Sequence, residues 1–320
     1  VPATDTAIRK MIKETDGDHF EDMRSLDQEL TFCETKKEFQ KRNITLERPQ
    51  MKTLGIINQD GIYTNLALLL SDQCVHTIKT AVFEGKNQNI FKDRKEFTGS
   101  LFAQMEAVYD YIDFRNQTHS TFEKLYRIDN RDYPEVAVRE ALLNCLVHRD
   151  YGYSSSILIS MYEDRLEFTS IGGLVTGVTL EDVMMGISVC RNKKLANVFY
   201  RLELIEAYGT GIQKIMNAYQ DQFIKPEIKV SNNVFKIILP NTNAQAELRE
   251  ELQYHTHIQP EDEETQIMQM IDQEKRIQRK QVQERLGISQ TTSGRILKQM
   301  VKKGLIMQRG RGKNTCYVKK

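Results

Sequence analysis

The sequence has no tryptophan, and only 17 glycines and 6 prolines are spread over its 320 residues. This scarcity excludes collagen-like and low-complexity chains. No apolar run approaches the roughly 18 residues that a membrane-spanning helix needs, and the first residues lack the pattern of a signal peptide. We therefore expect a globular, cytoplasmic protein. Because the chain begins with Val1 rather than Met, we also expect its natural N-terminus to lie further upstream.

Closely spaced metal ligands are also lacking. The five cysteines are odd in number, widely scattered, and never form a CxxC pair. A structural zinc site needs thiolates and imidazoles at short, regular spacing. The pattern therefore argues against zinc and is typical of the reduced thiols of a cytosolic protein.

A P-loop is missing as well. The nearest match to GxxxxGK[ST] is RGRGKNT at 309–315, where Asn follows Gly-Lys. A helicase motor needs the full motif, because its backbone and lysine cradle the nucleotide phosphates. We therefore expect no helicase motor in this chain.

Charge is distributed unevenly along the chain. The net charge is only +1, yet residues 275–320 contain 14 Lys or Arg and a single acid, Glu284, so this stretch carries +13 and the rest carries −12. A length of 320 residues exceeds one ordinary core, so we expect two or three domains. A basic terminal module on an acidic body predicts a polyanionic partner, with nucleic acid the first candidate.

The basic tail has the pattern of a winged helix. EETQIMQMIDQE and RKQVQERLG read as two helices, and ISQTTSGRILKQMVKKG reads as a third, with Ser289 as its N-cap and Gly304 as its end. Two strands joined by RGRGKN follow. Helix, helix–turn–helix and β-hairpin within about 60 residues predict a winged helix at 263–320.

This arrangement predicts a binding surface for double-stranded DNA. The N-terminal part of the third helix would enter the major groove, while basic residues there and on the hairpin would contact phosphates. A winged helix that binds protein, with a solvated basic face, is the alternative. The predicted DNA-binding residues are Arg279, Lys280, Gln290, Thr291, Thr292, Arg295, Lys298, Arg309, Arg311 and Lys313.

The rest of the chain mixes helices and strands, which predicts an α+β fold. The expected elements are a strand within 76–85, a helix over 99–114, a helix opened by Pro134, a hairpin over 154–170, a short helix at 179–186, two helices within 192–219 and a strand at 233–240. We place an N-terminal α/β region at 1–115, a second domain at 116–240 and a linker at 241–262.

The helix opened by Pro134 carries a polar stripe. REALLNCLVHRDY is apolar almost all round, yet Glu140, Asn144 and His148 recur at i, i+4 and i+8 on one face. Buried polar groups need partners, so water, backbone or a ligand must satisfy them. The stripe is therefore either a chemical site or the wet edge of a core helix, with His148 as a buried imidazole next to an acid.

Two glycine-rich turns lie downstream, IGG at 171–173 and GTG at 209–211. Glycine allows close approach to the backbone, and a helix N-terminus attracts anions. Together with the stripe they suggest a phosphate site, in which Asn144 could bind Mg²⁺ and Glu140 could position water. Taken alone, the GTG turn also fits a simple helix break.

The order EALLN, IGGL, YGTGI, with strands between, resembles the gyrase, heat-shock-chaperone, histidine-kinase and MutL (GHKL) ATPase fold. REALLNCLVHRDY, RLEFTSIGGL and RNKKLANVFYRLELIEAYGTGI resemble a bacterial family described as RecG-related ATP-dependent helicases or transcriptional regulators. In full-length members a Schlafen/AlbA-like domain precedes the region that corresponds to Val1.

The resemblance implies a GHKL-like α/β sandwich with ATP and Mg²⁺ as ligands, and a DNA-binding regulator that forms a homodimer. It implies that Glu140 orients the hydrolytic water and that Asn144 holds Mg²⁺. At the middle motif the chain has Ser170 where active members carry the Asp that reads adenine. The nucleotide-binding residues implied are Asn144, His148, Ser170, Gly172, Gly173, Gly209, Thr210 and Gly211. A regulator with a degenerate nucleotide domain used for sensing or dimerisation, a slow ATPase acting on DNA, and a scaffold with a purely structural domain all remain open.

Overall fold

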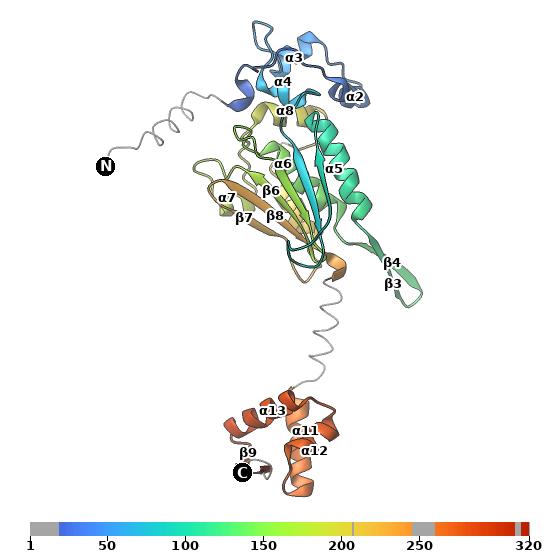
Figure 1. Ribbon diagram of the computed structural model, residues 1–320, viewed down its shortest axis with the longest axis vertical. Coiled ribbons are helices and arrows are strands. Elements are labelled where there is room, and N and C mark those ends of the chain that lie inside the picture. The colour runs from blue at the N-terminus through green and yellow to red at the C-terminus, as the bar shows by residue number, and fades with distance from the viewer. Residues whose placement is uncertain (1–18, 207, 245–259, 311–314, 320) are drawn as a thin grey trace, which may run out of the picture. The chain divides into compact units, whose positions relative to one another are not determined.

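The computed structural model describes residues 19–206, 208–244, 260–310 and 315–319. The chain divides into two compact units, one up to residue 246 and one from residue 247 (Figure 1). Each unit is described by itself. Among the described residues, no helix has the length and apolar character that crossing a bilayer requires.

The first unit is built on a six-stranded mixed sheet with the strand order β2-β1-β5-β6-β8-β7. Only β1 and β5 run parallel, and every other neighbouring pair is antiparallel. The strands are β1 (Ile78–Phe83), β2 (Phe91–Phe97), β5 (Ile157–Met161), β6 (Arg165–Ile171), β7 (Glu227–Val230) and β8 (Val234–Pro240).

One face of this sheet carries the core. Strands β5, β6 and β8 alternate, so that every second residue, such as Ile159, Phe168 and Ile237, is fully buried. On the opposite face Glu167 lies between Arg165 and Lys236, at 2.7 and 2.8 Å. A sheet with one apolar and one polar face forms a two-layer sandwich. The α+β class and the sandwich predicted from the sequence are confirmed.

Helices α5 (Leu101–Arg115) and α6 (Glu135–Val147) cover the apolar face, and α9 (Gly211–Ala218) packs along α6. Pro134 stands at the N-cap of α6, where a missing N–H costs nothing. Nine of the thirteen residues of α6 are buried. This burial makes α6 the central helix of the unit.

Shorter elements gather at one end of the sheet (Figure 1). They are η1 (Phe20–Asp22), α2 (Cys33–Lys41), α3 (Arg48–Leu54), α4 (Asn65–Leu70) and α8 (Lys193–Arg201). The buried Glu21 carboxylate accepts hydrogen bonds from the backbone N–H groups of Lys194 and Leu195, at 2.7 and 2.9 Å. It therefore caps α8 and ties it to the start of the described chain.

Several local predictions are confirmed. β5 and β6 form the expected hairpin, and α7 (Leu180–Met184) begins with a capping box between Thr179 and Asp182. The helices α8 and α9 are separated by the GTG turn, as expected. Residues 1–18, the first part of the N-terminal α/β region expected at 1–115, lie outside the described residues.

The second unit has the predicted order of elements. It comprises α11 (Pro260–Glu274), α12 (Arg279–Leu286), α13 (Gln290–Lys302), β9 (Ile306–Arg309) and β10 (Cys316–Lys319). The Ser289 hydroxyl accepts from the Thr292 N–H at 3.2 Å, which confirms it as the N-cap of α13. A separate core holds the unit together, with Ile267, Ile271, Ile277, Val282, Leu297, Met300 and Tyr317 among its buried side chains.

The domain limits differ from those expected. β1 and β2 lie in the region 1–115 that we placed apart, yet β1 pairs with β5 in the same sheet. Residue 115 is therefore no boundary, because only a shared sheet buries the apolar face of β1. The expected linker starts at Asn241, and its second residue, Thr242, hydrogen-bonds back to Arg131 at 2.7 Å. Its last residues, 260–262, already belong to α11.

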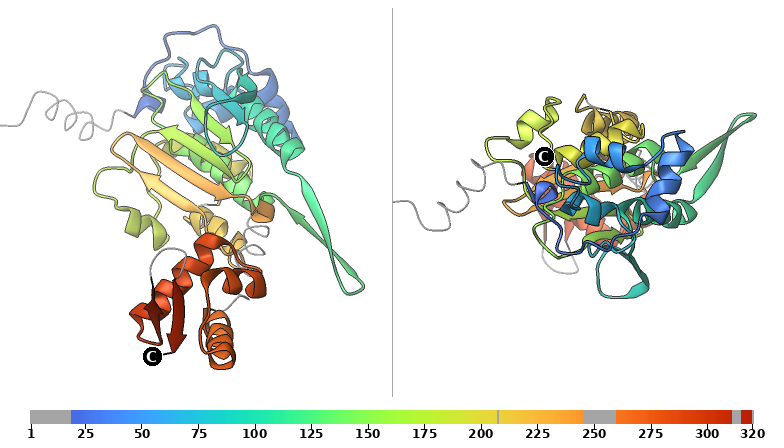
Figure 2. Two further views of the ribbon diagram at one scale, coloured as in Figure 1. Left: turned by 60° about the horizontal axis from the view of Figure 1, so that its bottom comes forward. Right: turned by 90° about the horizontal axis from the view of Figure 1, so that it is seen from above.

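One feature of the first unit had no counterpart in the predictions. Strands β3 (Thr118–Glu123) and β4 (Tyr126–Arg131) form a separate two-stranded arm. The arm projects away from the body of the first unit in Figure 1 and in both views of Figure 2. Its residues are mostly polar and exposed, so they lack the alternation by which a half-buried strand is recognised.

The core of the sandwich depends on Phe168, which is fully buried on β6. Phe168→Ala should lower the free energy of unfolding by about 3–5 kcal/mol, because it removes buried ring surface and leaves a cavity. Phe223→Ala, at a ring that is 67% exposed, is the matched control and should change it by under about 0.5 kcal/mol. Urea unfolding of both variants provides the measurement, and similar losses would contradict this account of the core.

Candidate functional site

The first unit contains a cavity of about 660 Å³ between α6, α9, the glycine-rich loop after β6 and the segment around α7. This volume lies in the range of small-molecule sites. The predicted residues among its walls are Glu140, Asn144, His148, Gly172, Gly173, Gly209, Thr210 and Gly211. Residues separated by some 70 positions in the sequence are thus brought to one site.

The polar stripe of α6 forms one wall of this cavity. Asn144 Nδ2 donates to the Glu140 carbonyl at 2.8 Å, one turn back. Since this bond uses the amide N–H, it directs Oδ1 to the other side, and no hydrogen bond to Oδ1 is recorded among the described residues. An amide oxygen held in this way suits a hard cation such as Mg²⁺, which also takes ligands from phosphate and water.

Glu140 is nearly buried, at 8% exposure, and is surrounded by cations. Its Oε1 is 2.6 Å from Arg139 Nη1 and 3.9 Å from Lys214 Nζ. Arg139 is held in turn by the Leu204 carbonyl at 2.6 Å, and Lys214 by Glu206 at 2.6 Å. The Glu140 carboxylate is therefore already engaged by the protein.

His148 is the C-cap residue of α6, and its backbone N–H donates to the Asn144 carbonyl at 3.0 Å. Burial, with a smaller contribution from the positive charge of Arg191, lowers the pKa of His148 to about 4. The imidazole is neutral at physiological pH. No acid partner for it is recorded among the described side chains, so the bridge to an acid that we considered is not seen.

The GTG turn brings the start of α9 against the stripe. A Cβ at Gly211 would lie 3.0 Å from Glu140 Oε2 and 3.1 Å from Asn144 Nδ2. Gly209 has φ +67°, and a Cβ there would lie 2.5 Å from the Gly186 carbonyl. Glycine is required at Gly209 by both conformation and space. The turn therefore does more than break a helix, because it lets two segments approach the stripe closely.

The IGG turn closes the opposite side. Gly172 has φ +112°, and a Cβ there would lie 3.0 Å from the Asp150 N–H. Gly173 leaves no room for a Cβ beside the Ser231 carbonyl, and its own carbonyl accepts from Arg191 Nη2 at 2.9 Å. Both glycines therefore hold the loop tightly against its neighbours, with the Arg191 guanidinium beside it.

Ser170 is not part of the cavity wall as the described residues form it. It is 2% exposed on β6 and contacts the Cys145 thiol under α6. Its alternation on the strand turns it to the core face, together with Phe168. The expected place of Ser170 in the cofactor site therefore has to be corrected, and no carboxylate takes over from it at that position.

Four charged residues of the cavity were not predicted: Arg191, Lys193, Glu206 and Lys214. Lys214 lies one turn after the GTG turn on α9, and Arg191 precedes α8. A basic residue one turn into a helix that begins with glycines is the signal that could have indicated Lys214. Nothing in the local pattern distinguishes Arg191 from a surface residue. Within the described chain, no cluster of three or more His, Cys, Asp or Glu could hold a metal on its own.

On the winged helix, α13 presents the predicted surface. Gln290, Thr291, Arg295 and Lys298 are exposed, whereas Thr292 is half-buried and contacts the Ser289 hydroxyl at 2.9 Å. Thr292 therefore takes part in the helix cap. Arg311 and Lys313 lie outside the described residues.

The basic side chains of this unit fall into two groups. Lys303, Arg285 and Lys319 are paired with Glu264, Glu274 and Asp272 at 2.6–3.1 Å, and Lys280 is 3.7 Å from Glu284. The other group is exposed and has no ion pair recorded among the described residues. Its members are Lys275, Arg276, Arg279, Arg295, Lys298, Lys302 and Arg309. This second group is free to meet phosphates.

Comparison with family models matches two parts of the chain. Residues 154–239 match the family described as "Putative ATP-dependent DNA helicase recG C-terminal", and residues 264–307 match a winged helix-turn-helix DNA-binding family. The first match covers β5 to β8 with both glycine turns. The second covers α11 to α13 and the start of β9. No curated protein matches the chain.

Among solved structures, the DIP2311 protein from Corynebacterium diphtheriae is similar, with a TM-score of 0.62 and 16% identity. The alignment covers 100% of this chain and 68% of that protein. At this identity the likeness concerns the fold alone. It supports the arrangement of elements described above.

The lowered pKa of His148 makes the stability of the chain depend on pH. The unfolded chain binds a proton at the ordinary value of 6.5, whereas the folded chain resists it down to about 4. The stabilisation is therefore complete above pH 6.5 and is lost as the pH falls towards 4. His148→Gln should lose less stability than wild type over this range, by on the order of 1 kcal/mol.

Urea unfolding at several pH values between 7.5 and 4.5 provides the measurement. His76, whose pKa burial also lowers to about 4, accounts for the slope that remains in the variant. His19→Gln, at an exposed imidazole, is the control and should follow wild type. Identical pH profiles for wild type and His148→Gln would rule out the buried neutral imidazole.

Proposed function

We propose that this chain, in which a RecG C-terminal-like ATPase domain is joined to a winged helix, is a DNA-binding regulator that senses a nucleotide. The DNA-binding part of this proposal rests on the exposed basic side chains around α13 that have no ion pair recorded among the described residues. Helix–turn–helix proteins place the N-terminal residues of this helix in the major groove. Gln290, Thr291 and Arg295 are exposed at that end.

Phosphate contacts fall to the cations that no acid neutralises. A Cβ at Gly294 would lie 3.9 Å from Arg279 Nη1, so Arg279 lies next to α13 and not far from Arg295. Lys298 and Lys302 continue along the same helix, one turn apart. Binding that releases counterions from the DNA needs such unpaired cations. Lys303, Arg285 and Lys319 serve the fold instead.

The DNA-binding proposal is tested with two triple variants that remove equal charge. Arg295→Ala, Lys298→Ala and Lys302→Ala together should weaken binding to duplex DNA at least tenfold and lower the slope of log K against log salt by about 1 per lost contact. The control combines Arg285→Ala, Lys303→Ala and Lys319→Ala, which lose the same charge from paired positions. Fluorescence anisotropy over a salt series measures both.

The control should keep most of the affinity and slope. Equal losses in both triple variants would mean that only the net charge matters, and the assigned surface would be wrong. Unchanged binding in the first variant would favour a winged helix that binds protein.

The ligand-sensing part rests on the cavity of the first unit. The Asn144 amide is oriented by its bond to the Glu140 carbonyl, and the glycine turns allow close approach. Arg191 and Lys214 line the cavity, where Asp150 lies 3.6 Å from the first and Glu206 lies 2.6 Å from the second, so a phosphate would compete with these acids. A Mg²⁺ nucleotide meets these groups through its phosphates and its metal. If Mg²⁺-ATP is bound, Asn144 would hold the metal, and the metal would supply charge neutralisation for the phosphates.

Slow turnover follows from the surroundings of Glu140. A general base must be free to accept a proton from water. The contacts with Arg139 and Lys214 stabilise the Glu140 carboxylate as an ion-pair partner. These contacts favour sensing over rapid hydrolysis, which remains the alternative function.

Calorimetric titration with a non-hydrolysable ATP analogue and Mg²⁺ tests this part. Asn144→Ala should raise Kd at least tenfold and remove its dependence on Mg²⁺, because the metal loses its protein ligand. Asn217→Ala, at an exposed position of α9 outside the cavity wall, should bind as wild type does. Absence of heat at millimolar analogue would refute nucleotide sensing and favour a structural domain.

A further inference from the structure

The β3–β4 arm exposes apolar side chains at its far end. Phe122, Leu125 and Tyr126 are 75%, 93% and 76% exposed, and Ile128 is 38% exposed. Among the described residues, β3 and β4 make extensive contacts only with each other. An isolated two-stranded hairpin is only marginally stable in water. The far half of this arm therefore gains little stability from the pairing of β3 with β4.

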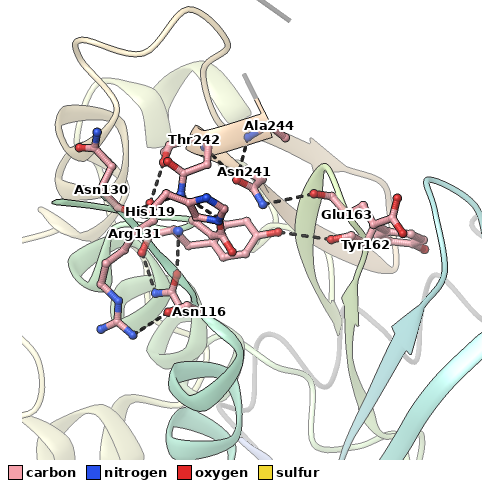
Figure 3. A network of polar contacts seen from close by, with 12 residues as sticks. Asn116, His119, Asn130, Arg131, Tyr162, Glu163, Asn241, Thr242 and Ala244 are labelled. Atoms are coloured by element: carbon pink, nitrogen blue, oxygen red, sulfur yellow. Dashed lines mark hydrogen bonds and ion pairs between the residues drawn. The ribbon is translucent and has the colours of Figure 1, made fainter. Parts of the chain in front are cut away.

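The base of the arm, in contrast, is firmly held (Figure 3). Asn116 Nδ2 donates to the Tyr133 carbonyl, and the Tyr133 N–H donates to Asn116 Oδ1, both at 2.8 Å. Thr242, just after β8, donates its N–H to the Asp132 carbonyl at 2.8 Å and its hydroxyl to the Arg131 carbonyl at 2.7 Å. The arm is thus anchored to both α5 and the end of the sheet.

Arg131 adds an ionic anchor. Its guanidinium pairs with Asp113 at 2.9 Å and with Glu135, and it donates to the Asn116 carbonyl at 3.0 Å. These contacts join the last residue of β4 to α5 and α6. Because side chains of three elements hold its base, the arm has a fixed direction. A fixed direction matters for an arm that contacts a partner.

The register places the apolar residues on both faces of the arm. Phe122 lies opposite Arg127, while Tyr126 lies opposite Glu123 and Ile128 opposite Thr121. Since residues that face each other share a side of the hairpin, Phe122 is on one face and Tyr126 and Ile128 are on the other. A flat surface could cover only one of these faces, whereas a partner strand at the β4 edge lies beside the side chains on both faces of β4.

We propose that β4 pairs with β4 of a second copy of this chain, antiparallel across a two-fold axis at Ile128, so that two arms form one four-stranded sheet. Among the described residues no third strand joins β3 and β4. At the base of β4 the carbonyls of Asn130 and Arg131 accept hydrogen bonds from Asn243 and Thr242, so the edge offered to a partner is its outer part, up to Asp129. The proposal does not depend on the nucleotide or DNA assignments above.

The charges of β4 complement themselves in this pairing. With Ile128 at the axis, Arg127 lies opposite Asp129 of the second copy, and Asp129 lies opposite its Arg127. Within one copy Arg127 and Asp129 already pair at 2.7 Å, so four alternating charges would lie on one face. Opposite charges across strands stabilise a sheet, and like charges destabilise it.

The same pairing also places the tip of each arm, at Leu125, near the base of the other arm. Counting three residues either side of Ile128, Leu125 of the second copy lies opposite Arg131, at the base of the arm. There the last turn of α5 presents Phe114, which is 84% exposed, and α6 presents Val136, which is 50% exposed. The apolar tip of one arm would therefore cover the exposed apolar residues at the base of the other.

The exposed area at this seam is that of a small interface. Phe114 and Tyr126 together expose roughly 240–400 Å², taking about 150–250 Å² for a fully covered aromatic side chain. A two-fold interface buries the same patch on both copies, which gives about 480–800 Å² before Leu125 and Ile128 are counted. Those two side chains bring the sum towards the roughly 1,000 Å² expected of a specific interface. An unrelated partner would have to supply a matching patch of its own.

Cysteine cross-linking of the full chain tests the axis. Ile128→Cys should give a covalent dimer on oxidation or with a short bis-maleimide, because residues opposite each other in neighbouring strands have Cβ atoms about 5 Å apart. Thr121→Cys is the matched control, since its twin would lie about three strand spacings away, or about 14 Å. Wild type gives the background from the native cysteines, among them the exposed Cys33.

Light scattering after size exclusion then tests the charges. Wild type should have the mass of a dimer, and Arg127→Asp should raise the dissociation constant at least tenfold, because it sets a carboxylate opposite Asp129. Combining Arg127→Asp with Asp129→Arg should restore the dimer. Circular dichroism checks that each variant keeps its fold.

A monomeric wild type at high micromolar concentration would overturn the proposal, as would a dimer that neither Arg127→Asp nor Phe122→Ser with Tyr126→Ser weakens. Arm variants that keep their mass but lose DNA affinity would assign the arm to nucleic acid instead. Cross-linking at Thr121→Cys that equals that at Ile128→Cys would place the axis elsewhere.

Discussion

The first unit depends on how α6 is buried. This helix has to cover the apolar face of a six-stranded sheet, and nine of its thirteen residues are buried in doing so. Eight of these nine side chains are apolar and the ninth is Glu140, so Glu140, Asn144 and the C-cap residue His148 form only a narrow polar strip. Because these groups need partners, the segments around them have to provide space and charge. The cavity is the result of this requirement.

The glycine turns follow from the same constraint. Gly211 starts α9 where any side chain would meet Glu140 and Asn144, and Gly172 and Gly173 hold the loop beyond β6 against its neighbours. The nearly buried Glu140 carboxylate also explains the neighbouring cations. A buried charge needs partners of opposite charge, and Arg139 and Lys214 lie beside it. The arrangement that stabilises Glu140 in the fold also withdraws it from catalysis, which links stability to the slow turnover proposed above.

Much of this could be predicted from the sequence, and the reasons are local. The stripe on α6 was visible as i, i+4, i+8 spacing, the winged helix as caps and apolar periodicity, and the β5–β6 hairpin as alternation around Glu163 and Asp164. The role of Lys214 and the burial of Ser170 could not be predicted, because each depends on which segments meet in three dimensions. The division at residue 115 failed for the same reason, since the parallel pairing of β1 with β5 joins residues about 80 positions apart and has no local signal.

The β3–β4 arm escaped prediction for a different reason. Sequence patterns identify strands by the core that they cover, and among the described residues β3 and β4 make extensive contacts only with each other. The complementarity of Arg127 and Asp129 emerges only when β4 is paired with an antiparallel second copy of itself, centred on Ile128. A strand whose charges match their own reverse, on a base anchored by Asn116, Arg131 and Thr242, has the features that an interface between identical chains requires. The cavity follows from the need of the polar groups on α6 for partners within one chain. The arm, in the proposal above, follows from pairing between two chains.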